Sequence, residues 1–162
     1  MARNRARIKG RGEAGRYAGI PHAVMLHQDF IALPPNAIRL LLEMARQYNG
    51  HNNGDLSAAW TLMQHRGFKS EPTLNKALHE LLAGNFIVRT REGRFLNPGR
   101  LCALYALTWQ AVDECPGKNL EIGPTATPLR RFTAEIIKMP TVETEAIGFR
   151  NCSHKLEKGC ET

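Results

Sequence analysis

The segment SAAWTLMQHRGFKSEPTLNKALHELLAGNFIVRTREGR (residues 57–94) contains two helix signals followed by a strand signal. We expect the first helix over SAAWTLMQHRG, because Ser57 is a suitable N-cap and Gly67 a suitable stop. The second helix is expected over SEPTLNKALHELLAG, opened by Ser70 and closed by Gly84. The run NFIVRTREGRF that follows is β-branched and ends in a glycine-containing turn, which predicts a β-ribbon. This connected order of helix, tight turn, helix and ribbon decides the fold.

The second predicted helix is amphipathic. Pro72 lies in its first turn, where a proline is tolerated. Its apolar residues recur at the spacing of one buried helical stripe: Leu74, Ala77, Leu78, Leu81 and Leu82. The opposite face carries Thr73, Asn75, Lys76, His79 and Glu80. One side of this helix is therefore expected to pack into a core, while the other side stays available to a partner.

Further elements are expected around this segment. The sequence PPNAIRLLLEMARQYNG (residues 34–50) predicts a helix with an apolar inner face. That face comprises Ile38, Leu41, Leu42 and Ala45. We expect a short helix or extended lead-in from His22 to Phe30, and a single short strand at Leu56 that pairs with the ribbon. LCALYALTW (residues 101–109) is apolar on both alternating faces, which predicts a strand buried on both sides.

Together these elements predict an α+β fold of the winged helix-turn-helix type over residues 20–116, with a three-helix core and a small antiparallel sheet and wing. Residues 1–19 are rich in Arg and Gly without apolar periodicity, so we expect a flexible, disordered basic arm. From Gln110 onward the prolines and weak periodicity indicate a segment lying over the domain surface. Residues 117–162 are predicted to be an irregular C-terminal extension, with a short helix over 132–139.

The charge of the chain favours a polyanionic partner. The 162 residues carry a formal net charge of +7 and a sequence pI of about 9.6. Residues 1–16 contribute +5 of this charge, whereas residues 110–162 contribute −1. The cationic character is thus concentrated at the N-terminus.

We expect a cytoplasmic protein without a membrane segment. No apolar run approaches the roughly 18–20 residues that span a bilayer, and no apolar stretch follows the basic N-terminus as in a secretory signal. The four cysteines (Cys102, Cys115, Cys152 and Cys160) are sparsely spaced, as is typical of unpaired thiols in a reducing compartment.

Enzymatic and metal sites are not indicated, so we expect no catalytic activity, cofactor or metal. The sequence contains no glycine-rich phosphate loop, no nucleophile elbow and no HExxH motif. The spacing of Cys152, His154 and Cys160 matches no common zinc finger, even with Cys115 added. The loop at 51–55 supplies too few carboxylates for a hard cation.

Three segments resemble a family of small winged helix-turn-helix proteins of bacteria, plasmids and phages. They are YNGHNNGDL, GFKSEPTLNKALHELLAGNFIVRTREGRF and LYALTWQAVDEC, and the resemblance covers about residues 20–116. It implies binding to double-stranded DNA, in transcriptional regulation or in replication. Both terminal segments lie outside the resemblance.

The candidate DNA-binding residues follow from this arrangement. In the helix over 70–83, expected in the major groove, the base readers are Thr73, Asn75, Lys76 and His79. Arg66 and Lys69 precede it within reach of phosphates, and Arg89, Arg91 and Arg94 belong to the wing (residues 89–100), expected on the DNA backbone. The arm would contribute Arg3, Arg5, Arg7, Lys9, Arg11 and Arg16. The alternative is that these residues form ordinary solvated faces, and that the arm is a solubilising tail.

A second hypothesis is that the chain is a winged-helix adaptor. Winged helices also serve as protein-interaction modules, so the fold alone does not decide between DNA and a protein partner. In this interpretation the proline-rich C-terminal segment docks onto a larger nucleoprotein complex. A homodimer is also compatible with the sequence, with Ile136 and Ile137 as the best candidates for the contact.

Overall fold

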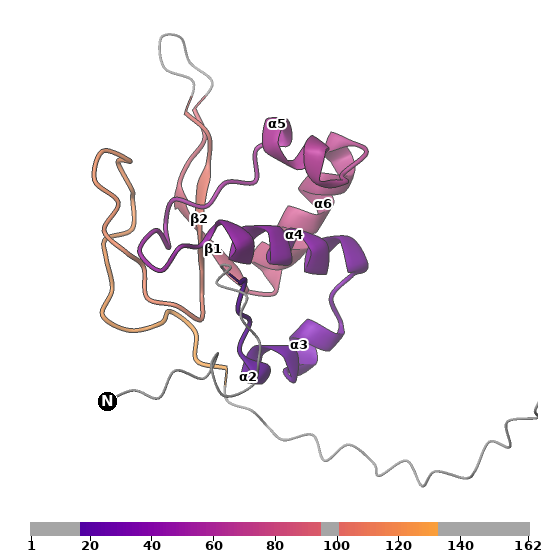
Figure 1. The fold of residues 1–162 in the computed structure, drawn as a ribbon, viewed down its shortest axis with the longest axis horizontal. Coiled ribbons are helices and arrows are strands. Elements are labelled where there is room, and N and C mark those ends of the chain that lie inside the picture. The colour runs from indigo at the N-terminus through magenta and orange to yellow at the C-terminus, as the bar shows by residue number, and fades with distance from the viewer. Residues whose placement is uncertain (1–16, 95–100, 133–162) are drawn as a thin grey trace, which may run out of the picture.

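The computed structural model describes residues 17–94 and 101–132. In these ranges the elements are α2 (His22–Met25), α3 (Gln28–Ile31), α4 (Pro35–Gln47), α5 (Trp60–Met63), the 3₁₀ turn η1 (Gln64–Arg66), α6 (Glu71–Ala83), β1 (Ile87–Arg91) and β2 (Leu104–Leu107) (Figure 1). Helices combined with a small antiparallel sheet form an α+β structure, as expected. Residues 1–16 of the basic arm predicted over 1–19, residues 95–100 of the predicted wing and residues 133–139 of the helix predicted over 132–139 lie outside the described residues.

The helix α4 forms where it was expected, but it buries a partly different face. Pro35 lies at the start of the helix. A proline is tolerated there because the first N–H groups of a helix have no partner within it, so the missing N–H costs no hydrogen bond. The buried residues are Ala37, Leu40, Leu41, Met44 and Ala45. Ile38 and Leu42 were predicted to be buried, but Ile38 is only half-buried and Leu42 is 48% exposed. Leu40 and Met44 are buried in their place. The apolar residues of this helix lie on several of its sides, so periodicity alone does not show which side is buried.

The helix predicted from Ser57 begins later than expected. α5 starts at Trp60, with Ala59 as its N-cap. The side chain of Gln47 accepts a hydrogen bond from the Ser57 N–H and donates one to the Ser57 carbonyl, both at 2.9 Å. This pair of bonds ties Ser57 to the end of α4, so Ser57 does not cap α5. The predicted stop is correct, because Gly67 ends η1 with a φ of +86°, in the left-handed region that glycine tolerates.

The strands β1 and β2 form an antiparallel hairpin. Ile87 pairs with Leu107 and Arg89 with Tyr105, and the register shifts before Arg91. Leu56 pairs with Tyr105 on the other side of β2 through two backbone hydrogen bonds of 3.1 and 2.8 Å. The single short strand predicted at Leu56 is therefore present as a bridge. The strand predicted over 101–109 forms only over 104–107, where all four residues are buried as predicted, whereas Leu101 and Cys102 are exposed.

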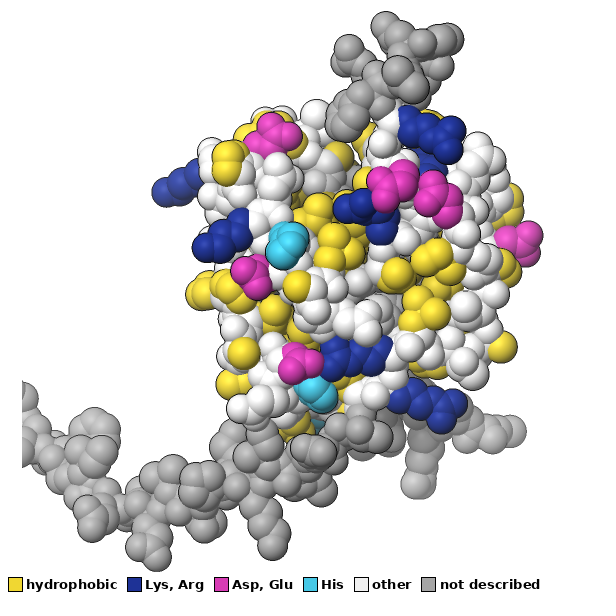
Figure 2. All heavy atoms as spheres, turned by 180° about the vertical axis from the view of Figure 1, so that it is seen from behind, with side chains coloured by type: hydrophobic (Ala, Val, Ile, Leu, Met, Phe, Trp, Pro, Cys, Tyr) yellow, Lys and Arg dark blue, Asp and Glu magenta, His cyan; other side chains and the backbone are white. Residues whose placement is uncertain are grey.

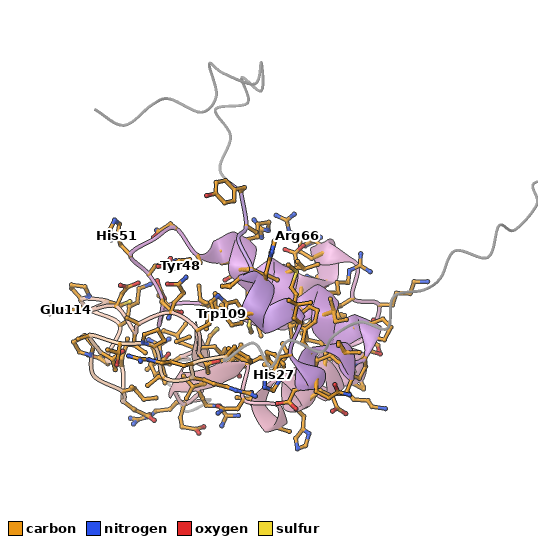
Figure 3. The ribbon with its side chains drawn as sticks, turned by 90° about the horizontal axis from the view of Figure 1, so that it is seen from below. His27, Tyr48, His51, Arg66, Trp109 and Glu114 are labelled. Carbon is orange, nitrogen blue, oxygen red and sulfur yellow. The ribbon has the colours of Figure 1, made fainter. Side chains whose placement is uncertain are left out.

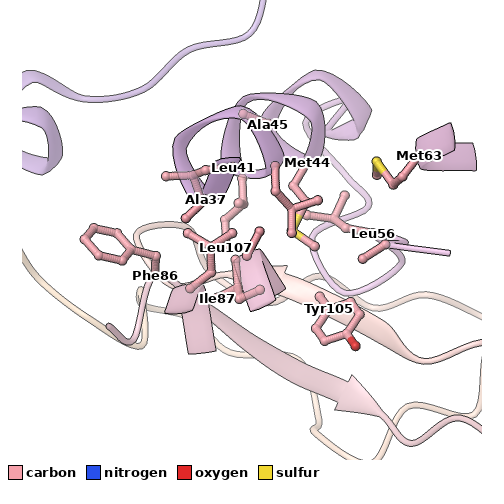
Figure 4. Close-up of a cluster of buried hydrophobic side chains, with 14 of the residues drawn as sticks. Ala37, Leu41, Met44, Ala45, Leu56, Met63, Phe86, Ile87, Tyr105 and Leu107 are labelled. Atoms are coloured by element: carbon pink, nitrogen blue, oxygen red, sulfur yellow. The ribbon is translucent and has the colours of Figure 1, made fainter. Parts of the chain in front are cut away.

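The core lies between the helices and one face of the hairpin. In Figure 4 the inner side chains of α4, such as Leu41 and Met44, point toward Ile87 and Leu107 of the two strands. Leu56 and Met63 close one end of this cluster, while α6 contributes further buried residues: Leu74, Ala77 and Leu81. The hairpin thereby fixes α4 and α6 over one of its faces.

The irregular segment over residues 117–132, here called the strap, runs along the hairpin on the side away from α4 and α6 (Figure 1, orange). The N–H of Glu121 donates to the carbonyl of Thr90 at 2.7 Å. The N–H of Arg130 donates to the carbonyl of Thr108 at 2.9 Å. The strap therefore binds to β1 and to the residue that follows β2 through backbone hydrogen bonds.

The domain boundary expected at residue 116 needs a correction. The ring of Phe132 stacks on that of Phe86 with centroids 5.5 Å apart, and Phe86 is a fully buried core residue. The sequence lacks periodicity here because the strap contributes single anchoring side chains to the core. The folded unit continues through Phe132, so the strap is part of the domain.

Asn53 connects the loop after α4 to the end of β2. It is fully buried, and its amide nitrogen donates to the carbonyls of Leu107, Gln110 and Ala111 at 3.0, 3.2 and 2.8 Å. Its side-chain oxygen accepts from the N–H of Leu107 at 2.7 Å, and its own N–H donates to the Asp113 carboxylate at 2.8 Å. One asparagine thus satisfies several backbone groups of a segment more than fifty residues away.

We predict that Asn53→Ala lowers the free energy of unfolding by roughly 2–4 kcal/mol, because it leaves buried backbone groups without partners. Urea titration of both proteins measures this difference. His51→Ala, in the same loop but exposed, serves as the control and should stay within about 0.5 kcal/mol of the parent. Equal stability of the two variants would contradict the role assigned to Asn53.

Candidate nucleic-acid interface

The helix α6 begins and ends as its sequence predicts. The Ser70 hydroxyl accepts from the N–H of Thr73 at 3.4 Å, and the two hydroxyl groups lie 2.8 Å apart. Gly84 forms the C-cap, and a β-carbon there would come within 2.9 Å of the Phe86 ring. The buried side of α6 packs against the core and contains Leu74, Ala77 and Leu81. These local signals fix which side chains face outward.

Three of the four predicted base readers are exposed. Asn75, Lys76 and His79 lie on the outward side of α6. Thr73 is half-buried, and its hydroxyl interacts with Ser70 at the start of the helix. Thr73 therefore helps to cap α6, and the outward polar face depends on the other three side chains.

The two basic residues before α6 differ in their surroundings. Lys69 is exposed and forms no ion pair with any described residue. Arg66 lies 3.7 Å from the carboxylate of Glu43 on α4, which also binds Arg46 at 2.8 Å. In Figure 3 the Arg66 side chain lies beside α4. Arg66 is thus partly neutralised, whereas Lys69 keeps its charge available.

The sequence did not point to Arg39, a further cation near these residues. A β-carbon at Gly67 would collide with the Arg39 guanidinium, so this side chain lies directly over the turn that precedes α6. Arg39 is on the outer side of α4, and the pattern of that helix predicts exposure. Exposure alone could not indicate that its neighbour is Gly67, twenty-eight positions later.

The three predicted wing arginines adopt three arrangements. Arg89 donates to the Glu92 carboxylate at 2.7 Å, and this bond raises the pKa of Arg89 above its ordinary value. Arg94 is exposed and forms no ion pair within the described part of the chain. Arg91 donates to the carbonyl of Cys102 at 2.8 and 3.2 Å and to that of Lys118 at 2.6 Å. Arg91 therefore clamps the strap onto the hairpin, with its guanidinium directed at backbone carbonyls.

A groove of about 500 Å³ separates α6 from the hairpin. Its apolar lining includes Ala58, Trp60, Leu74, Leu78, Leu101 and Tyr105, and its polar lining includes Glu71, Asn75, Arg89, Glu92 and Arg94. Figure 2 shows hydrophobic surface on this side of the molecule, bordered by side chains of both charges. The predicted reading helix and the predicted wing thus face one shared hollow.

The described part of the chain is only weakly basic. The described residues include eleven Lys or Arg and nine Asp or Glu, a net charge of +2 out of the +7 of the whole sequence. The predicted arm residues Arg3, Arg5 and Arg7 lie outside the described residues. Any strong attraction of a polyanion would therefore need the cations of the remaining residues.

Among the described residues, neither a metal-binding group nor an activated thiol at Cys115 is indicated. These residues contain no group of three or more His, Cys, Asp or Glu side chains that could hold a metal ion. Burial raises the pKa of the Cys115 thiol, which disfavours the reactive thiolate. In addition, no helix among the described residues is long and apolar enough to cross a membrane.

Comparisons with protein-family models, curated proteins and solved structures gave no match to this chain. Its binding chemistry is therefore inferred from the surface that α6 and the hairpin form. That surface combines the exposed polar face of α6, an apolar groove, and the cations Lys69 before α6 and Arg94 on the hairpin side.

We predict that Arg91→Ala lowers the free energy of unfolding by about 1–2 kcal/mol, because it removes three charge-assisted hydrogen bonds to carbonyls. Arg94→Ala removes the same charge from an exposed site and should change stability by less than about 0.5 kcal/mol. Chemical denaturation of both variants provides the comparison. If Arg91→Ala is as stable as Arg94→Ala, its contacts with the strap contribute nothing to the fold.

Proposed function

We propose that this chain is a winged helix-turn-helix protein that binds double-stranded DNA, as a regulator or replication-associated factor of the plasmid or phage type. The order α4, Leu56 bridge, α5, α6 and hairpin supports the proposal, because it is the order of elements in such domains. α6, with 13 residues, is long enough to lie in a major groove, whose width admits one helix.

The observation that carries the proposal is the outward face of α6. Asn75, Lys76 and His79 are exposed together on a helix whose opposite side is anchored in the core. Asn can bind adenine through two hydrogen bonds, and Lys can donate to the acceptors of guanine. Because the backbone of α6 is fixed by its caps, these side chains are presented in a constant arrangement. This combination suits sequence readout.

Cations on either side of α6 would bind the DNA backbone. Lys69 lies directly before the helix, and Arg94 lies at the edge of the groove on the hairpin side. Contacts of this kind position a protein on the duplex without reading its sequence. Because the described residues carry only a weak net charge, most of the electrostatic attraction would come from the arm, with Arg3, Arg5 and Arg7 among its cations.

One observation favours the second candidate function, a winged-helix adaptor. The groove between α6 and the hairpin has an apolar floor that includes Trp60 and Leu78, and Glu71 and Glu92 lie along it. Apolar surface beside acidic groups suits a protein partner better than a phosphate backbone. In this case the groove would hold a segment of a larger nucleoprotein complex, and α6 would contact protein.

The salt dependence of binding separates these functions. We predict that the full chain binds random duplex DNA, with an affinity that falls steeply as salt increases. Deleting residues 2–16 removes six cationic side chains and should make the slope shallower, by about 0.9 for each phosphate that the arm neutralises. Fluorescence anisotropy across a salt series measures both slopes. An absence of binding at about 50 mM salt would argue against DNA and for the adaptor.

Sequence readout is tested on α6 itself. A preferred site is first selected from a random duplex pool with the full chain. Asn75→Ala and Lys76→Ala should then each weaken binding to that site by roughly 1–3 kcal/mol, and binding to random DNA much less. Lys118→Ala removes a cation from the strap and should leave site preference unchanged. Equal losses on both DNAs would mean that α6 does not read bases.

A further inference from the structure

We propose that Arg130 of the strap is a positioning residue, which holds α6 at a fixed angle to the hairpin. It does so from a place where it touches neither the outward face of α6 nor the groove. This inference rests on the proposed function in one respect, namely that α6 and the hairpin contact DNA together. Its structural part, the fixing of the turn between them, stands on its own contacts.

The guanidinium of Arg130 joins three segments. One terminal nitrogen donates to the carbonyl of Gly84, the C-cap of α6, at 2.5 Å. The other donates to the carboxylate of Asp29 on α3 at 2.6 Å. The Arg130 side chain is 19% exposed and that of Asp29 is 48% exposed, so the bond to Gly84 is partly desolvated and the bond to Asp29 is open to solvent. The cation also complements the partial negative charge at the end of a helix.

Aromatic rings complete the surroundings of Arg130. Its guanidinium carbon lies 4.2 Å from the centroid of the Phe132 ring and 5.6 Å from that of Phe86, both within cation–π distance. His27 and Trp109, labelled in Figure 3, both contact Phe132 edge to face. The set of Arg130, Asp29, Gly84 and Phe132 is called the Arg130 clamp below.

The clamp acts on the one covalent connection between α6 and β1. This turn consists of Gly84, Asn85 and Phe86. Asn85 has a φ of +53°, a conformation that asparagine adopts more readily than most residues. The Thr108 hydroxyl lies 2.9 and 3.0 Å from the carbonyls of Asn85 and Phe86, and the Arg130 N–H donates to the Thr108 carbonyl. The turn is therefore held from outside by β2 and the strap.

Arg130 is unsuited to a direct phosphate contact. Its guanidinium is directed at Gly84 and Asp29, and its bond to Asp29 holds the pKa of that carboxyl below the ordinary value. The ion pair is therefore intact at neutral pH. The neighbouring Arg131, in contrast, is exposed and forms no ion pair with a described residue. Arg131 is thus a matched control, with the same charge one position along the chain.

The consequence for binding is specific. A duplex that contacts α6 and the hairpin at once requires a defined angle between them. Without the clamp, the turn can open, and part of the binding free energy is used to restore that angle. Sequence-specific affinity should then fall, while the number of neutralised phosphates, and hence the salt slope, stays the same.

The test compares Arg130→Ala, Arg130→Lys and Arg131→Ala in the full chain, on a selected site and on random duplex DNA across a salt series. We expect Arg130→Ala to weaken binding to the selected site about tenfold, the equivalent of one charge-assisted hydrogen bond, with an unchanged slope. Arg130→Lys should recover only part of this loss, because an ammonium lacks the planar fork. Arg131→Ala should keep the site preference.

The following results on DNA would overturn the proposal. In the first, Arg130→Ala weakens binding to both DNAs equally and lowers the slope by about 0.9, which would make Arg130 a phosphate contact. In the second, Arg130→Ala prefers the selected site over random DNA as strongly as the parent chain does. If Arg130→Ala does not fold, Asp29→Asn removes the ion pair but leaves Arg130 in place. It should weaken binding to the selected site by a smaller factor, with an unchanged salt slope. An unchanged site preference in that variant also overturns the proposal.

Hydrogen exchange keeps this test independent of the proposed function. The N–H groups of Asn85 and Phe86 donate to the carbonyls of Leu82 and Leu81, so their exchange rates report opening of the turn. They should exchange about tenfold faster in Arg130→Ala than in Arg131→Ala. If the parent chain binds no DNA, DNA binding fails as the function while this measurement still decides the clamp. Equal exchange rates in Arg130→Ala and Arg131→Ala would show that the Arg130 clamp does not hold the turn.

Discussion

The hairpin of β1 and β2 needs cover on both faces, because an isolated two-stranded ribbon is only marginally stable in water. The helices α4 and α6 cover one face with their apolar sides, and the strap runs along the hairpin on the side away from them. Leu56 adds backbone pairing at the free edge of β2. Asn53 then fixes the loop that carries Leu56 to the end of β2. The placement of the outward face of α6 follows from these contacts.

Arginine serves opposite purposes in this fold. Arg91 and Arg130 direct their guanidinium groups at backbone carbonyls and hold the strap in place. Arg94 remains exposed at the edge of the groove, and Arg89 forms an ion pair with Glu92. A count of basic residues on the hairpin therefore overstates how many guanidinium groups are free to bind a polyanion. What matters is which cations already have partners within the protein.

The parts of the fold with local causes could be predicted from the sequence. Ser70 and Gly84 determine the ends of α6 through contacts within a few residues. The start of α5 could not be predicted, because Gln47 binds Ser57 from a separate helix. The direction of Arg91 was equally inaccessible, since its acceptors lie 11 and 27 positions away. Side-chain partners at such separations depend on the assembled fold, and a single sequence does not state them.

The ion pair between Asp29 and Arg130 has a consequence for the order of folding during synthesis. Its partners are 101 positions apart, so nearly all of the described chain must leave the ribosome before the pair can form. Contacts across such a separation close late, because the entropy of a long loop has to be overcome first. α4 and α6 can meet earlier, while the turn after α6 is still unrestrained. An incomplete nascent chain therefore lacks the contacts that join α3, the turn after α6 and the strap, and these contacts form only once Arg130 has been synthesised.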